Sequence, residues 1–265
     1  MNITIDGRTL HCEVHGDGPA VLLVHGFPLS GRLWDPVVAS LRQGFRLIVP
    51  DLRGHGLSAA TPTATVGDYA DDLAALLDAS GESRPVALVG MSMGGYVAFE
   101  FCRRYRRRVG ALVLTNTRAQ ADTAEAARGR RETAARVRLE GSAIVADAMT
   151  PKLFGPDAPK ALREAWRAIM AATPPDGVAA ALLAMADRPD SLATLAGLDC
   201  PILIVAGEHD AIAPPADAQA MREAAPHAQL EIVPATGHMT VVERPDRFVA
   251  ALAAFLRTLD AKPGR

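Results

Sequence analysis

Residues 86–100 read as a buried strand, a sharp turn and a helix in immediate succession. The first part, 86–89, is a valine-rich apolar run of the kind found in buried parallel strands. The turn that follows has the sequence Gly-Met-Ser-Met-Gly over residues 90–94. Beyond the turn, apolar side chains are spaced as one face of a helix, at Val97, Phe101 and Cys102. A serine at the tip of such a turn is typical of a catalytic nucleophile, so Ser92 is the first candidate.

The two glycines that flank Ser92 have a physical purpose. Side chains two residues before and two residues after the serine would collide in so tight a turn, and Gly90 and Gly94 have none. The turn also places Ser92 at the start of a helix, where free backbone N–H groups and the helix dipole favour a developing oxyanion. The alternative is a chance match in a glycine-rich turn, but the strand before it and the helix after it favour a functional role.

The composition suits one large α/β domain with an insertion, or two small domains, because 265 residues with 49% apolar content can bury a sizeable core. A formal net charge of −2 argues against a nucleic-acid or membrane-surface partner. We expect no signal peptide and no transmembrane helix, since no apolar run reaches about 18 residues. The cysteines are odd in number and far apart, and are expected to be reduced, buried thiols of a cytoplasmic protein: Cys12, Cys102 and Cys200.

Apolar runs that read as strands recur along the whole chain. Eight are expected, over residues 3–5, 10–14, 20–24, 45–49, 86–89, 111–114, 201–205 and 229–233. The first two alternate apolar and polar residues around Asp6-Gly7, which predicts an antiparallel hairpin at a sheet edge. The later ones alternate with helical segments, such as 66–79 and a closing helix over 241–259. The fold class is therefore α/β, with a mostly parallel eight-stranded sheet and helices on both faces.

The alternation of strands and helices stops between residues 117 and 190. This stretch is rich in alanine and helical in its apolar spacing. We expect a helical cap, or lid, over 117–190, inserted into a core domain formed by 1–116 and 191–265. Its large apolar side chains are candidates for lining a substrate pocket, or for the core of the cap itself: Trp166, Met170 and Met185.

A serine hydroxyl needs a base within hydrogen-bond reach, and the base needs an acid to orient it. Asp210 and His238 each follow a late strand, so both can reach the edge of the sheet where Ser92 lies. In this interpretation Ser92 attacks an acyl carbon, His238 moves the proton to the leaving group, and Asp210 orients the imidazole. The backbone N–H groups of Phe27 and Met93 are expected to stabilise the oxyanion.

Each of these candidates has a structural alternative. His238 also reads as an ordinary loop histidine, and Asp210 as a helix cap, with Glu208 as a rival acid. Two other histidines are expected to support the fold rather than the chemistry, namely His25 and His55. His209 has no second ligand at a useful spacing, so we expect no metal.

Five motifs together resemble the α/β-hydrolase superfamily. They are His25-Gly-Phe-Pro, Asp51-Leu-Arg-Gly-His-Gly-Leu-Ser58, Gly90-Met-Ser-Met-Gly-Gly95, Gly207-Glu-His-Asp210 and Gly237-His238. The similarity is greatest to cofactor-free serine hydrolases of the esterase, enol-lactonase and non-haem-haloperoxidase-like branch. Epoxide hydrolases and haloalkane dehalogenases share the fold but have an aspartate where this chain has Ser92. The superfamily does not fix the substrate, because specificity depends on the pocket.

The resemblance implies hydrolysis of a small carboxylic ester or lactone through an acyl-serine intermediate. Two alternatives remain open at this point. One is cleavage of a carbon–carbon bond in a diketone by the same residues. The other is a receptor-like protein that binds a small ligand in the pocket, although an intact Ser-His-Asp set argues against binding alone. The sequence does not predict the oligomeric state.

Overall fold

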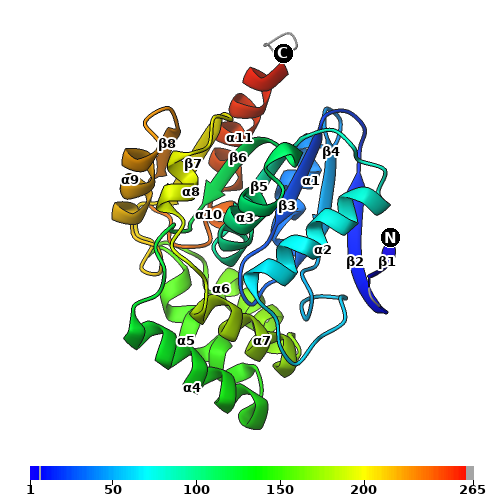
Figure 1. Cartoon of the computed structure of the whole chain (residues 1–265). Coiled ribbons are helices and arrows are strands. Elements are labelled where there is room, and N and C mark those ends of the chain that lie inside the picture. The colour runs from blue at the N-terminus through cyan, green and yellow to red at the C-terminus, as the bar shows by residue number, and fades with distance from the viewer. Residues whose placement is uncertain (6, 261–265) are drawn as a thin grey trace.

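The computed structural model describes residues 1–5 and 7–260, and its framework is one eight-stranded sheet in the order β1-β2-β4-β3-β5-β6-β7-β8 (Figure 1). The strands are β1 Asn2–Ile5, β2 Arg8–His15, β3 Ala20–Val24, β4 Arg46–Pro50, β5 Val86–Met91, β6 Val109–Thr115, β7 Ile202–Gly207 and β8 Gln229–Val233. The pairs β1·β2 and β2·β4 are antiparallel and all others are parallel. The predicted α/β fold and edge hairpin are confirmed; Asp6 of the predicted turn lies outside the described residues.

The central strands are apolar throughout because both faces of the sheet are covered. In β3, Val21 and Leu23 join the apolar cluster on one face, whereas Leu22 and Val24 join the cluster on the other. The first face packs against helices α1 (Asp35–Leu41) and α11 (Pro245–Asp260). The second packs against α2 (Val66–Ala79) and α3 (Met93–Arg104), and farther along against α8 (Leu192–Ala196) and α9 (Pro215–Ala224).

Local sequence signals explain where several helices begin and end. A capping box starts α2, since Thr65 Oγ1 accepts the N–H of Asp68 and the Asp68 carboxylate accepts the N–H of Thr65. A short 3₁₀ turn, η1 (Gly31–Trp34), leads into α1. The closing helix expected over 241–259 is confirmed for its larger part, as α11. Pro245 has no backbone N–H to continue the preceding segment, so the first residues form a separate short helix, α10 (Thr240–Glu243).

Between β6 and β7 the chain forms five helices, and the first four gather at the end of the sheet where the parallel strands finish (Figure 1). They are α4 (Ala124–Glu140), α5 (Ala143–Leu153), α6 (Lys160–Ala172) and α7 (Pro175–Ala186), and we call them the cap helices. Helix α7 is buried over most of its length, and α4 turns Ala127, Ala134 and Val137 inward. Among the described helices none is by itself long and apolar enough to span a membrane; α6 and α7 meet that test only as a pair bent by 95°.

Candidate active site

Ser92 lies between the end of β5 and the start of α3 in a strained conformation, with φ 53° and ψ −115°. A positive φ is uncommon for a residue with a side chain. The flanking glycines allow the turn: a Cβ on Gly90 would lie 2.4 Å from the carbonyl oxygen of Gly94, and a Cβ on Gly94 would lie 2.2 Å from that of Val24. The close packing predicted around the serine is therefore present, and one contact reaches the neighbouring strand β3.

The three residues proposed from the sequence meet at this turn. Ser92 Oγ is 2.9 Å from His238 Nε2, and His238 Nδ1 is 2.8 Å from Asp210 Oδ2. The imidazole and the carboxylate are almost completely buried, with 2% and 3% of their residue surface exposed, whereas Ser92 is half-buried. An imidazole that donates from Nδ1 to a carboxylate offers the lone pair of Nε2 to the serine hydroxyl. The arrangement can thus take the proton from Ser92.

Asp210 is held as an ionised acceptor on both oxygens. Its Oδ1 accepts the N–H groups of Ile212 at 2.8 Å and Ala213 at 2.9 Å, but it does not cap α9, whose N-cap residue is Pro214. Burial alone would raise the pKa of Asp210, but the charge and hydrogen bond of His238, together with the other donors, lower it below its usual value. The rival acid Glu208 does not face the imidazole, since it accepts the N–H of Ala235 instead.

Asn116 is a site residue that the sequence interpretation missed. It follows β6 directly and has a left-handed backbone, with φ 48°. Its Nδ2 donates to Asp210 Oδ2 at 3.0 Å and to the carbonyl oxygen of Gly237 at 3.2 Å, so it joins the acid to the loop that carries His238. The available signal was a polar side chain at the carboxyl end of a buried strand, next to Thr115.

Gly26, which precedes the proposed oxyanion donor Phe27, lies against the nucleophile turn, and the other proposed donor, Met93, lies within that turn. A Cβ on Gly26, which precedes Phe27, would lie 3.1 Å from the Cβ of Ser92. Met93 is the first residue of α3, so its N–H has no partner within the helix. The carbonyl oxygen of Ser92 accepts two hydrogen bonds, from the N–H of Gly95 at 2.9 Å and from the hydroxyl of Thr117 at 2.8 Å.

Two buried histidines support the loop that contains Phe27. His25 Nε2 accepts the N–H of Leu52 at 2.9 Å, and its Nδ1 donates to the carbonyl oxygen of Gly26 at 2.9 Å. The His55 ring lies 5.3 Å from the His25 ring, between their centroids. Burial lowers the pKa of both imidazoles, so both are neutral at pH 7. This is the bracing role suggested for His25 from the sequence.

The three apolar side chains predicted for the pocket or the cap core are all buried, but they do not meet. Trp166 and Met170, on α6, belong to the apolar cluster of the α1 and α11 face. Met185, on α7, belongs to the opposite cluster, which also contains Phe27 and Met93. The two cap helices therefore pack against different faces of the core, and a substrate contact for any of these side chains stays a prediction.

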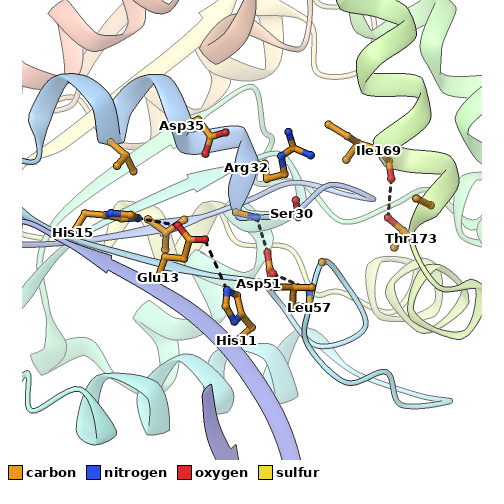
Figure 2. A pocket seen from close by; sticks show the side chains of 15 residues that line it. His11, Glu13, His15, Ser30, Arg32, Asp35, Asp51, Leu57, Ile169 and Thr173 are labelled. Atoms are coloured by element: carbon orange, nitrogen blue, oxygen red, sulfur yellow. Dashed lines mark hydrogen bonds and ion pairs between the residues drawn. The ribbon is translucent and has the colours of Figure 1, made fainter. Parts of the chain in front are cut away.

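A pocket of about 360 Å³ lies away from the triad, between β2, the start of α1 and the end of α6 (Figure 2). Its polar groups are largely paired with one another: Glu13 lies 2.9 Å from His15, and Asp51 accepts the N–H groups of Gly31 and Leu57. None of Ser92, Asp210 and His238 lines it. Within residues 1–5 and 7–260, no group of three His, Cys, Asp or Glu side chains is arranged to hold a metal ion.

Residues 19–245 match the family described as the alpha/beta hydrolase fold. A thermophilic esterase from Thermogutta terrifontis has a similar structure, with a TM-score of 0.95 and 42% sequence identity, covering 98% of this chain and 99% of that one. The enol-lactonase from Burkholderia xenovorans has a TM-score of 0.88 at 27% identity, covering 97% and 100%. In sequence, 3-oxoadipate enol-lactonase 1 of Acinetobacter baylyi is 28% identical over 258 residues, 96% of this chain and 95% of its own. The chain therefore belongs to the α/β-hydrolase fold family, in its esterase and enol-lactonase-like branch, and is a hydrolase.

Proposed function

We propose that the protein hydrolyses small carboxylic esters or lactones through an acyl-serine intermediate, with Ser92, His238 and Asp210 as the catalytic residues. The observation that carries the proposal is the unbroken hydrogen-bonded chain from Ser92 Oγ through the imidazole to the Asp210 carboxylate. The names of similar proteins support the substrate class, since they include an esterase and two enol-lactonases.

In the first half of the reaction, Ser92 Oγ attacks the carbonyl carbon while His238 Nε2 accepts its proton. The carbonyl oxygen becomes an oxyanion, which the N–H groups of Phe27 and Met93 stabilise. The carbon–oxygen bond to the leaving group then breaks, and His238 gives the proton to the departing alcohol. In a lactone this alcohol stays attached to the acyl group.

In the second half, a water molecule attacks the acyl-serine while His238 accepts one of its protons. Collapse of the second tetrahedral intermediate releases the carboxylic acid and returns the proton to Ser92 Oγ. The ionised Asp210 stabilises the imidazolium that exists between the two proton transfers. Its lowered pKa supports this role, because the carboxylate keeps its charge at neutral pH.

We further propose that residues 117–190 form a cap that covers this site. The position of α4 to α7 at the carboxyl end of the sheet supports this (Figure 1). Two hydrogen bonds also support it: Thr173, between α6 and α7, donates to the carbonyl oxygen of Pro28, and Leu153 of α5 accepts the N–H of His238. The cap therefore contacts both the loop that carries Phe27, here called the oxyanion loop, and the loop of residues 237–239, here called the histidine loop.

The direct test is the Ser92→Ala variant, assayed on aryl acetates, simple lactones and a ring-cleavage diketone. We expect ester and lactone turnover to fall by at least about 10³-fold, with the circular dichroism spectrum unchanged. Ser40→Ala is the matched control, since Ser40 is exposed on α1 and should keep full activity. Mass spectrometry should detect the acyl adduct on Ser92 and not on Ser40. Wild-type turnover by Ser92→Ala would refute the proposal.

A further inference from the structure

The carboxylate of Glu243, at the end of α10, accepts three backbone N–H groups. Its Oε1 accepts those of Gly237 at 2.9 Å and Met239 at 3.2 Å, which are the residues on either side of His238. Its Oε2 accepts the N–H of Gly155 at 2.7 Å, in the segment between α5 and α6. One side chain thus connects the histidine loop of the core with a loop of the cap.

The same cap segment also holds the histidine loop directly. The carbonyl oxygen of Leu153 accepts the N–H of His238 at 2.7 Å and that of Met239 at 3.1 Å. The backbones are in contact, because a Cβ on Gly237 would lie 2.5 Å from the nitrogen of Gly155. All three amides of residues 237–239 are therefore donated to Glu243, to Leu153, or to both.

We propose that Glu243 is a positioning residue for the reaction proposed above: by fixing the loop of residues 237–239 to the cap segment 153–155, it holds His238 in line between Ser92 and Asp210. The inference rests on the proposed function of the triad. In this proposal the cap helps to orient the imidazole of His238, in addition to covering the site.

A carboxylate is suited to this position by its chemistry. Both oxygens of an ionised glutamate are acceptors, so they satisfy N–H groups on two sides at once, whereas a glutamine of the same size places a donor on one side. Burial raises the pKa of Glu243, and the three N–H donors and the charge of Arg163 oppose that rise. Arg163 stays nearby because its guanidinium donates to the carbonyl oxygen of Gly155 at 2.5 Å. The N–H donors and Arg163 favour the charged form, but burial outweighs them and the pKa of Glu243 stays above its usual value.

The consequence for the reaction is large because proton transfer depends steeply on geometry. A misplacement of about 1 Å costs about 10²-fold in rate. Loss of the Glu243 carboxylate leaves the amides of Gly237 and Gly155 without their acceptor, so the loop is free to shift. The effect should appear in kcat rather than in KM, because Glu243 acts through His238 and not through the substrate.

The experiment compares Glu243→Ala and Glu243→Gln with Glu208→Gln as the matched control. Glu208 is a carboxylate that accepts one amide, that of Ala235, at the base of the same loop. On an aryl acetate we expect Glu243→Ala to lose about 10- to 100-fold in kcat per active site, with KM within about twofold of wild type. Glu243→Gln should lose less, because one oxygen still accepts, and Glu208→Gln should match wild type.

Two further readouts separate positioning from simple misfolding. Titration with an aryl phosphonate counts the functional Ser92 sites, so kcat is expressed per competent molecule. Hydrogen exchange should become faster in peptides covering residues 236–240 and 153–156 in the Glu243 variants, and not in Glu208→Gln. An unchanged kcat per titrated site in Glu243→Ala overturns the inference, as does unchanged exchange in those peptides. An inactive Ser92→Ala beside a fully active Glu243→Ala refutes only this inference, whereas an active Ser92→Ala refutes the proposed function itself.

Discussion

Acid should destabilise this protein through His55 before it protonates most carboxylates. The His55 side chain has no exposed surface, its Nδ1 donates to the carbonyl oxygen of Arg53 at 3.0 Å, and within the described part of the chain its Nε2 has no partner. Burial, with a smaller contribution from the neighbouring His25, lowers its pKa to about 3. The folded protein therefore resists a proton that the unfolded chain accepts readily.

The dependence of stability on pH follows from the difference in bound protons between the folded and the unfolded state. A histidine in an unfolded chain titrates at about pH 6.5. Between that pH and about pH 3, the unfolded state therefore binds one proton more at residue 55 than the folded state does. The contribution of His55 to the free energy of unfolding is complete above about pH 6.5 and falls by about 1.4 kcal/mol for each pH unit below it. At about pH 4.5 the loss from this one residue is about 2.7 kcal/mol.

The assay is urea unfolding of wild type and His55→Asn at about pH 7 and about pH 4.5. Asparagine keeps a donor near the carbonyl oxygen of Arg53 but does not titrate. The cavity that it leaves lowers stability equally at both pH values, so the informative quantity is the drop between them. We expect that drop to be about 2 to 3 kcal/mol smaller in the variant than in wild type. His227→Asn, at an exposed position, is the control and should reproduce the wild-type drop.

An equal drop in His55→Asn and wild type, with equal denaturant slopes, would refute the reasoning. His25 contributes in the same direction, because burial also lowers its pKa against the opposing charge of Asp51. Its Nε2 accepts the N–H of Leu52, and a protonated imidazole has no lone pair to offer there. Acid should therefore loosen the loop that carries Phe27, and esterase activity should fall together with stability.

Three other substitutions have defined outcomes. Asp210→Asn should stay folded and lower kcat by about 10⁴-fold, since an amide cannot stabilise the imidazolium, which steady-state kinetics will measure. Asn116→Gly suits the left-handed backbone but removes the donor to Asp210, so kcat should fall about tenfold, and a fall within twofold would contradict the bridging role. Arg188→Met breaks a buried ion pair with Asp122 of 2.7 Å and should cost about 3 kcal/mol in urea unfolding, whereas the exposed Arg136→Met should leave the urea midpoint close to that of wild type.

Much of the fold was predictable because periodicity and turn chemistry are local. The strand at Gln229–Val233 and the helix at Val66–Ala79 have the predicted bounds, and the helix was predicted from its one apolar face. The expected convergence of Ser92, Asp210 and His238 needed only one further rule, that the carboxyl ends of parallel strands share one edge. Their hydrogen-bonded geometry agrees with that expectation.

What the sequence did not predict depends on contacts between distant segments. Asn116 bridges to Gly237, and Glu243 gathers amides from two loops that are separated by about eighty residues of chain. Neither pattern produces a periodicity or a motif, since the partners are backbone groups that every residue carries. The division of Trp166 and Met185 between opposite faces likewise depends on how α6 and α7 bend away from each other, by 95°.

These contacts limit how the cap can move. A rigid opening of the four cap helices would break the bonds from His238 and Met239 to Leu153, and the bond from Thr173 to Pro28. It would therefore disturb the base and the oxyanion loop at the moment of substrate entry. A cap that opens freely would have its hinge residues far from the loops that carry Phe27 and His238. We therefore expect substrate to enter through local movements within the cap, with the segment at 153–155 staying fixed to the histidine loop.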